Sequence, residues 1–222
     1  MFRATIGGAF DLARASLNGR QDFEVALYAK GVTVRGGVTL ENLTAVGLLC
    51  LEGVQSHGQL CLKDVRITGA SASGLPHWFH QPDWDDGQPV EQRVFALDAR
   101  SARVATTMQL HESSFSGRVD LRHAHCETLD ADLTRKSDPT RVVIDGLTYE
   151  HVEADWFRED RFDNWLPRDE KDYRPQPYVQ LAEVFASHGE DSHALGVLLR
   201  KATRDTRRNW YESRGDDNRA KA

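Results

Sequence analysis

The chain has 222 residues, of which 40 % are hydrophobic and 28 % are charged, so it holds enough apolar residues for a folded core. Its formal net charge of −6 at pH 7 argues against a protein that coats nucleic acid. No stretch approaches the roughly 20 apolar residues of a membrane-spanning helix, and no apolar signal segment follows Met1, so we expect a cytoplasmic protein.

An eleven-residue repeat runs from near the N-terminus to about residue 151. Three consecutive blocks at 37–69 show it best, reading GVTLENLTAVG, LLCLEGVQSHG and QLCLKDVRITG. More divergent blocks lie at 9–19, 26–36, 94–104, 107–117, 118–128 and 141–151, and residues 20–25 form an insertion after the first of them. Positions 2 and 4 of every block are apolar, and position 11 is Gly in six of the nine blocks.

The apolar positions of the repeat predict short strands, because side chains along a strand alternate between two faces. Position 4 holds Leu40, Leu51 and Leu62, and in block 94–104 we place Leu97 there. The Gly at position 11 suits a corner, since Gly accepts positive φ. Two blocks, about 22 residues, then make one coil of four sides, and parallel ladders stack the coils. The sequence predicts a mainly β fold, with a four-sided parallel solenoid over residues 1–151.

Residues 70–93 interrupt the repeat with three Pro, two Gly, two Trp and several Asp, a composition typical of a protruding loop. Aromatic anchors dominate the energetics of protein interfaces, so this loop is a candidate partner-binding segment. The residues predicted to bind are Trp78, Phe79, Trp84, Asp85 and Asp86. The alternative is that the same tryptophans cover a flank of the solenoid.

Two further sets of residues have side chains suited to metal binding or thiol chemistry. His77 and His80, three residues apart, and Asp83 are donor types that suit zinc, but we prefer the interpretation of an aromatic loop packed on the solenoid wall. The cysteines Cys50, Cys61 and Cys126 are odd in number and lie among apolar residues, so we expect buried thiols. We expect no cofactor. Residues 127–140 look like a second insertion.

After residue 151 the pattern changes to that of helices. Pro177 marks the start of a helix, and Gly189 marks its end. A second helix starts near Ser192, with Ala194, Leu195, Leu198, Leu199 and Ala202 at helical spacing. One such pair cannot bury its own apolar face, so we predict that residues 152–222 form a small helical cap on the solenoid.

The end of this second helix is basic, whereas residues 151–191 carry 11 Asp/Glu against 5 Lys/Arg. Its basic residues are Arg200, Lys201, Arg204, Arg207 and Arg208. One interpretation is a solvated helix face. The other is contact with an acidic partner or with anionic lipid headgroups.

The repeat resembles the quadrilateral right-handed β-helix of pentapeptide-repeat proteins. The chain departs from that family because its spacing alternates five and six, and because the residue two before the strand centre is often Val, Leu or Phe. It is more similar to actinobacterial β-helix proteins that join such blocks to a segment like Trp165-Leu166 and residues 175–182, which read PQPYVQLA. That group is labelled membrane-associated oxidoreductase. The resemblance implies a right-handed β-helix and an association with the membrane, while no residue here supports the redox half of the label.

Three classes of function remain: a non-catalytic interaction scaffold, a DNA mimic that binds a topoisomerase, and an oxidoreductase by family label alone. Residues 1–150 carry 15 Lys/Arg and 19 Asp/Glu, a balance that disfavours the DNA mimic. Motifs such as GxGxxG, GxSxG and HExxH are missing from the sequence, which disfavours an enzyme. We therefore predict a scaffold that binds a protein, in the cytoplasm or at an anionic membrane surface, and we do not expect it to bind nucleic acid.

Overall fold

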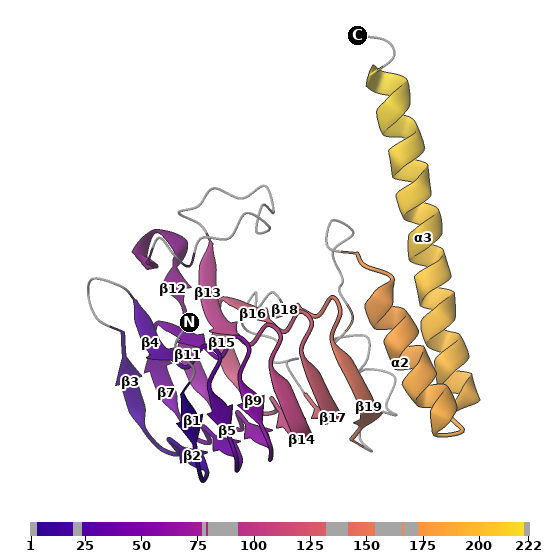
Figure 1. Cartoon of the computed structure of the whole chain (residues 1–222). Helices are drawn as coiled ribbons and strands as arrows, with labels where there is room; N and C mark the ends of the chain where they lie inside the picture. Colours follow the sequence, from indigo (N-terminus) through magenta and orange to yellow (C-terminus); the bar gives the residue numbers. More distant parts are fainter. Residues whose placement is uncertain are drawn as a thin grey trace. The chain divides into compact units, whose positions relative to one another are not determined.

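The computed structural model describes residues 4–19, 24–76, 79, 93–131, 142–153, 166 and 173–219, with side chains of the last range given to residue 208. The chain divides into two compact units, Met1–Glu153 and Ala154–Ala222. The first consists of short strands and the second contains two helices (Figure 1). The prediction of a mainly β chain with parallel sheets and a two-helix C-terminal region is confirmed.

The β unit contains three sheets, whose ladders are parallel except at one strand. Sheet A holds β1 (Thr5–Ile6), β2 (Phe10–Asp11), β5 (Thr33–Val34), β6 (Val38–Thr39), β9 (Gln55–Ser56), β10 (Leu60–Cys61), β14 (Arg103–Gln109), β17 (His125–Asp130) and β19 (Thr148–Val152). Sheet B holds β3 (Ser16–Asn18), β7 (Thr44–Val46), β11 (Arg66–Thr68) and β15 (Ser114–Ser116). Sheet C holds β4 (Val25–Tyr28), β8 (Leu48–Cys50), β13 (Val94–Asp98), β16 (Arg118–Asp120) and β18 (Val142–Val143), with β12 (Ala70–Ser71) antiparallel to β13 and followed by the short helix η1 (Ala72–Gly74).

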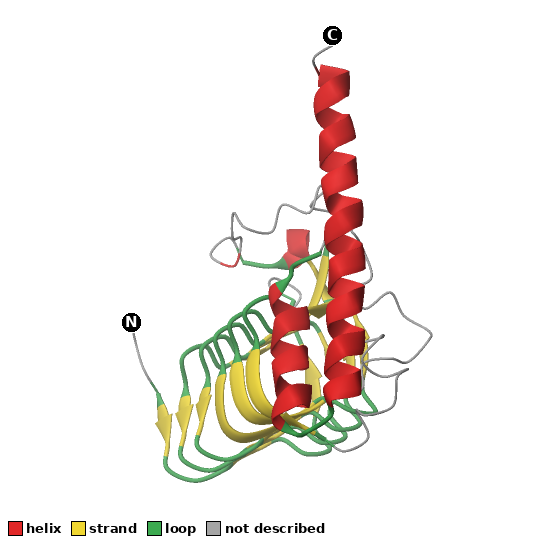
Figure 2. Cartoon of the chain, turned by 90° about the vertical axis from the view of Figure 1, so that its right-hand side faces the viewer, coloured by secondary structure: helices red, strands yellow, loops and turns green. Residues whose placement is uncertain are grey.

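Strand pairing follows the repeat. Val38 pairs with Leu60, which holds the same position two blocks later, so neighbours in a ladder are two blocks apart. Phe10 pairs with Val38, and their separation exceeds two blocks by the length of the insertion at 20–25. Leu60 pairs with Met108, so this ladder continues across the interruption at 70–93. Strands of one ladder lie side by side, and short loops lead to the next ladder (Figure 2).

Two details of the predicted repeat are wrong. Leu97 pairs with Leu49 and Val119, which occupy position 2, so block 94–104 was placed two residues too early. The ladder shifts register between Phe95 and Leu97, and both residues are apolar, so either frame satisfies the pattern. Residues 127–140 add almost no length, because Val119 pairs with Val142, which lies close to two blocks further along the chain. In addition, Glu127–Asp130 belong to β17.

A left-handed residue at position 6 turns the chain in every block once the frame of block 94–104 is moved by two residues. The residues at this position, all with φ between 54° and 74°, are Arg14, Gly31, Asn42, Gly53, Asp64, Ser101, Glu112, His123 and Gly146. The N–H of position 7 then donates to the carbonyl of position 4, as from Leu43 to Leu40 at 3.2 Å. Positive φ at the third residue of such a turn is the type II arrangement. The sequence predicts a turn between the two apolar pairs of each block as well as at the position-11 Gly, and the positive φ values place that turn at position 6.

The interior of the β unit is filled by the position-4 column. Leu40, Leu51 and Leu62 are each at most 1 % exposed. The N-terminal strands pack less well: Ile6 and Phe10 are only half-buried, and they border an apolar cavity of about 200 Å³. The core is therefore tighter in the later strands than in β1 and β2.

The helical unit contains α2 (Gln176–Ser187) and α3 (Asp191–Arg219). Pro177 lies in the first turn of α2, where its missing N–H costs nothing. The helix ends at Gly189, whose φ is +78°, with Glu190 N donating to Phe185 O at 2.9 Å and Gly189 N to Ala186 O at 3.0 Å. These two bonds make a Schellman cap, so both predicted ends of this helix are confirmed. Among the helices described, none has the length and apolar character to cross a membrane.

Candidate functional site

Arginines of α3 line a groove within the helical unit. Arg200, Arg204 and Arg207 are spaced by four and three residues, so they share one face of the helix. The groove has a volume of about 510 Å³, and its walls are completed by Leu166, Tyr178, Leu199 and Thr203. We call it the arginine groove. Cationic donors and an apolar floor are thus combined in one concave surface.

Arg204 is the most enclosed donor of the arginine groove. Its guanidinium carbon lies 5.9 Å from the ring centroid of Tyr178, within the range of a cation–π contact. Its Nη1 atom is buried, and no atom of the described residues accepts a hydrogen bond from it. A buried donor without an acceptor costs about 1–3 kcal/mol. An anionic group in the groove would supply that acceptor.

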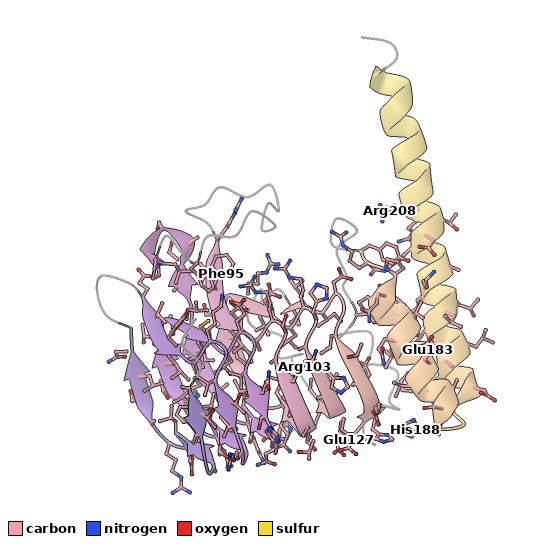
Figure 3. All side chains as sticks on the ribbon, in the orientation of Figure 1. Phe95, Arg103, Glu127, Glu183, His188 and Arg208 are labelled. Carbon is pink, nitrogen blue, oxygen red and sulfur yellow. The ribbon has the colours of Figure 1, made fainter. Side chains whose placement is uncertain are left out.

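Lys201 and Arg208 differ from the groove arginines. The Nζ of Lys201 lies 2.9 Å from Asp205 Oδ2, and the Tyr173 hydroxyl donates to the other oxygen of the same carboxylate. Burial and this hydrogen bond raise the pKa of Tyr173, and the hydrogen bonds from Tyr173 and Lys201 lower the pKa of Asp205. Arg208 is exposed and does not line the groove (Figure 3). The predicted basic segment therefore separates into three groove arginines, one ion-paired lysine and one arginine outside the groove.

Leucines of α3 lie beside the arginines and point to solvent. Leu195 and Leu199 are each 59 % exposed and Leu198 is 43 % exposed, whereas Ala194 and Val197 are buried. The sequence spacing identified a helix but could not tell which apolar residues face α2. An apolar surface beside the groove was therefore missed, although the leucine spacing was its signal.

A cluster in sheet C brings together the donor types of a metal site. One donor atom each of Cys50, Glu52 and Asp98 lies within 4.8 Å of the others. Arg100 already binds both oxygens of the Asp98 carboxylate. Its Nε donates to Oδ1 and its Nη2 donates to Oδ2, both at 2.8 Å. Lys30 Nζ lies 2.7 Å from Glu52. Burial raises the pKa of the Cys50 thiol to about 12, so it is protonated at neutral pH, whereas metals bind the thiolate.

The same arrangement repeats one coil later, where Arg122 Nε and Nη2 bind Asp120 at 3.0 and 2.9 Å. Asp98 and Asp120 are each 1 % exposed and pair directly in the ladder. Burial raises the pKa of Asp98, and the hydrogen bonds from Arg100 oppose this shift. These carboxylates are neutralised by arginines within the fold, so we assign them to structure. These ion pairs have a sequence signal that was missed. Asp is followed two residues later by Arg at 98–100 and again at 120–122.

Of the loop residues predicted to bind a partner or a metal, the structure describes only Phe79. Phe79 is 4 % exposed, and its ring meets edge-on that of Phe95, which is labelled in Figure 3, with centroids 6.1 Å apart. It belongs to an apolar cluster with Leu48 and Leu75, so its ring faces the core and offers little surface to a partner. The other predicted residues lie outside the described part of the chain: His77, Trp78, His80, Asp83, Trp84, Asp85 and Asp86.

No protein-family model, curated protein or solved structure matches this chain. The arginine groove is therefore the feature from which a function can be inferred.

Proposed function

We propose that the protein is a non-catalytic interaction scaffold, in which the β unit is a right-handed, four-sided β-helix and the arginine groove binds an anionic group of a protein partner. Four rows of strands support the β-helix: sheets B and C supply one row each, and sheet A supplies two, joined where β14 pairs with both β9 and β10. The neighbours within each row are one coil apart in sequence.

The observation that carries the binding role is the buried Nη1 of Arg204. Natural proteins satisfy the large majority of buried polar groups, so an orphaned donor in a groove needs a reason. Arg200 and Arg207 border the same groove and add positive charge. A carboxylate or phosphate bound there gains charge-assisted hydrogen bonds, which are stronger than neutral ones.

The non-catalytic part of the proposal rests on how the β unit uses its reactive groups. Catalysis needs a titratable or nucleophilic group that meets a substrate in a cleft. In the described residues, the carboxylates Asp98 and Asp120 are bound by arginines, and the three cysteines are buried. These groups hold the coils together and are not presented to solvent.

A pull-down from lysate with the full chain as bait tests the function. We expect a specific partner that Arg204→Gln loses and that Arg208→Gln retains, because Arg208 lies on the same helix outside the groove. Both variants remove one positive charge, so a difference between them reports on the groove and not on net charge. A Trp78→Ala, Trp84→Ala double variant tests the loop separately. Loss of the partner from the loop variant alone would overturn the groove as the binding surface.

A further inference from the structure

We infer that the arginine groove takes an acidic, leucine-bearing peptide segment of the partner, so that one segment contacts both the arginines and the ridge of α3 formed by Leu195 and Leu199. The inference rests on the proposed function and adds the chemistry of the ligand. It follows from two features of α3 that lie side by side, the cationic groove and an apolar surface.

The apolar requirement comes from Leu199. It lines the groove and is 59 % exposed, and Leu195, one turn earlier on the same ridge, is equally exposed. Leu166 and Tyr178 add apolar surface to the groove. A ligand that is only an anion leaves Leu195 and Leu199 in water, whereas a leucine next to its carboxylates removes them from solvent.

The acidic requirement comes from Arg204, whose buried Nη1 has no acceptor among the described residues, and from the positive charge that Arg200 and Arg207 add to the groove. From Leu195 to Arg207 the helix rises about 18 Å, at about 1.5 Å per residue. This length suits roughly three turns of a partner helix with acidic and apolar residues on one face. The nearby Asp205 carboxylate does not repel such a ligand strongly, because Lys201 and Tyr173 already bind it.

A peptide fits these observations better than an anionic membrane. The arginines line a concave groove, and both Arg200 and Arg204 are half-buried, so a flat layer of headgroups reaches them poorly. A single chain can enter the groove and approach the guanidinium group of Arg204.

Fluorescence anisotropy with the full chain and a short fluorescein-labelled peptide, with Glu and Leu at helical spacing, tests the inference. Two control peptides carry Gln in place of every Glu, or Ser in place of every Leu. We expect each control to bind at least about tenfold more weakly than the Glu/Leu peptide. Phosphatidylserine/phosphatidylcholine vesicles are titrated in parallel, and circular dichroism checks that every protein variant is folded.

Matched variants locate the contact. Arg204→Gln and Leu199→Ser should each weaken binding of the Glu/Leu peptide about tenfold. Their neighbours outside the groove, Arg208→Gln and Leu198→Ser, should change it by less than about twofold. Equal effects of Leu199→Ser and Leu198→Ser would place the peptide elsewhere and overturn the inference.

The outcomes separate the inference from the proposed function. If the Ser-substituted peptide binds as well as the Glu/Leu peptide, the leucine requirement is wrong while an anion-binding groove stands. If no peptide binds but Arg204→Gln still loses the partner in the pull-down, the acidic-peptide ligand is wrong and the scaffold function survives. If the vesicles bind and the peptides do not, a lipid surface replaces the peptide. Failure of all these ligands together with an unchanged pull-down would overturn both proposals.

Discussion

In the β unit, Asp98 and Asp120 are each 1 % exposed, and each is bound by an arginine two residues further along the chain. In the helical unit, a guanidinium nitrogen of Arg204 is buried, and no described group accepts a hydrogen bond from it. Leu199 in the same unit is 59 % exposed. The β unit thus neutralises these two buried carboxylates with its own arginines, while the helical unit leaves the Arg204 donor without an acceptor and a large apolar side chain in solvent. Groups that stabilise a fold are therefore poor candidates for binding here, and groups that the fold leaves unsatisfied are the better ones.

The largest effect should come from a charge in the leucine column. Leu62 is 0 % exposed, so Leu62→Asp buries an unpaired carboxylate and should lower the free energy of unfolding by more than about 4 kcal/mol. The control is Leu198→Asp on α3, where the side chain is 43 % exposed and the change should stay within about 0.5 kcal/mol. Urea denaturation followed by circular dichroism measures both. If the two variants lose the same free energy of unfolding, the β unit and the helical unit do not differ in how they use their leucines.

The next effect should come from the buried ion pair. Asp98→Asn removes the nearer counter-charge of Arg100, leaving only Glu52 at 3.4 Å, and should cost about 3 kcal/mol of unfolding free energy. Adding Arg100→Met removes the remaining buried charge, so the double variant should recover part of that loss. Thermal and urea unfolding compare the two variants. If the single variant loses nothing, these carboxylates are not structural and regain their standing as candidate functional groups.

A corner of the β unit should be less costly to disturb. Gly47 has φ +115°, and a Cβ atom there would lie 2.5 Å from the carbonyl oxygen of Glu24. Gly47→Ala should therefore destabilise the protein by about 1–3 kcal/mol. The matched control is Gly8→Ala, because a Cβ at Gly8 meets no atom of the described residues within 4 Å. A similar melting temperature for both variants would show that the close approach at Gly47 relaxes freely.

The parts that sequence predicted correctly are those with a local signal. The Leu and Gly periodicity predicted the strands of the repeat, and Pro177 and Gly189 predicted the ends of α2. Leu97 was misplaced because Phe95 and Leu97 both fit the apolar pattern, and only the left-handed Ser101 distinguishes the two frames. The arginine groove could not be predicted from the sequence. The spacing of its arginines is visible in the sequence, but their position next to Tyr178 depends on how the helices pack in the tertiary structure.

A smaller effect concerns the three buried cysteines, all of which lie in the β unit. Burial raises the pKa of Cys126 to about 12 from 9.0. A thiol with a raised pKa in the folded state stabilises the fold below pH 9 and loses this contribution as pH rises toward 12, so each such thiol should lower the free energy of unfolding by about 1 kcal/mol at about pH 10. Urea unfolding at about pH 8 and about pH 10 measures it, since Cys126→Ala should lose less stability between the two conditions than the wild-type chain. An equal loss would assign the alkaline sensitivity to other groups.

The smallest effect on stability should come from the residue that matters most for binding. Arg204→Met removes the orphaned Nη1 donor, which is favourable by about 1 kcal/mol, and also removes the contact over Tyr178, which is unfavourable by a similar amount. The two contributions nearly cancel, so unfolding free energy should change by less than about 0.5 kcal/mol while partner capture is lost. Asp98→Asn is the opposite case, with a large loss of stability. A loss of more than about 2 kcal/mol in Arg204→Met would make this arginine structural as well, and the groove would then belong with the buried ion pairs of the β unit.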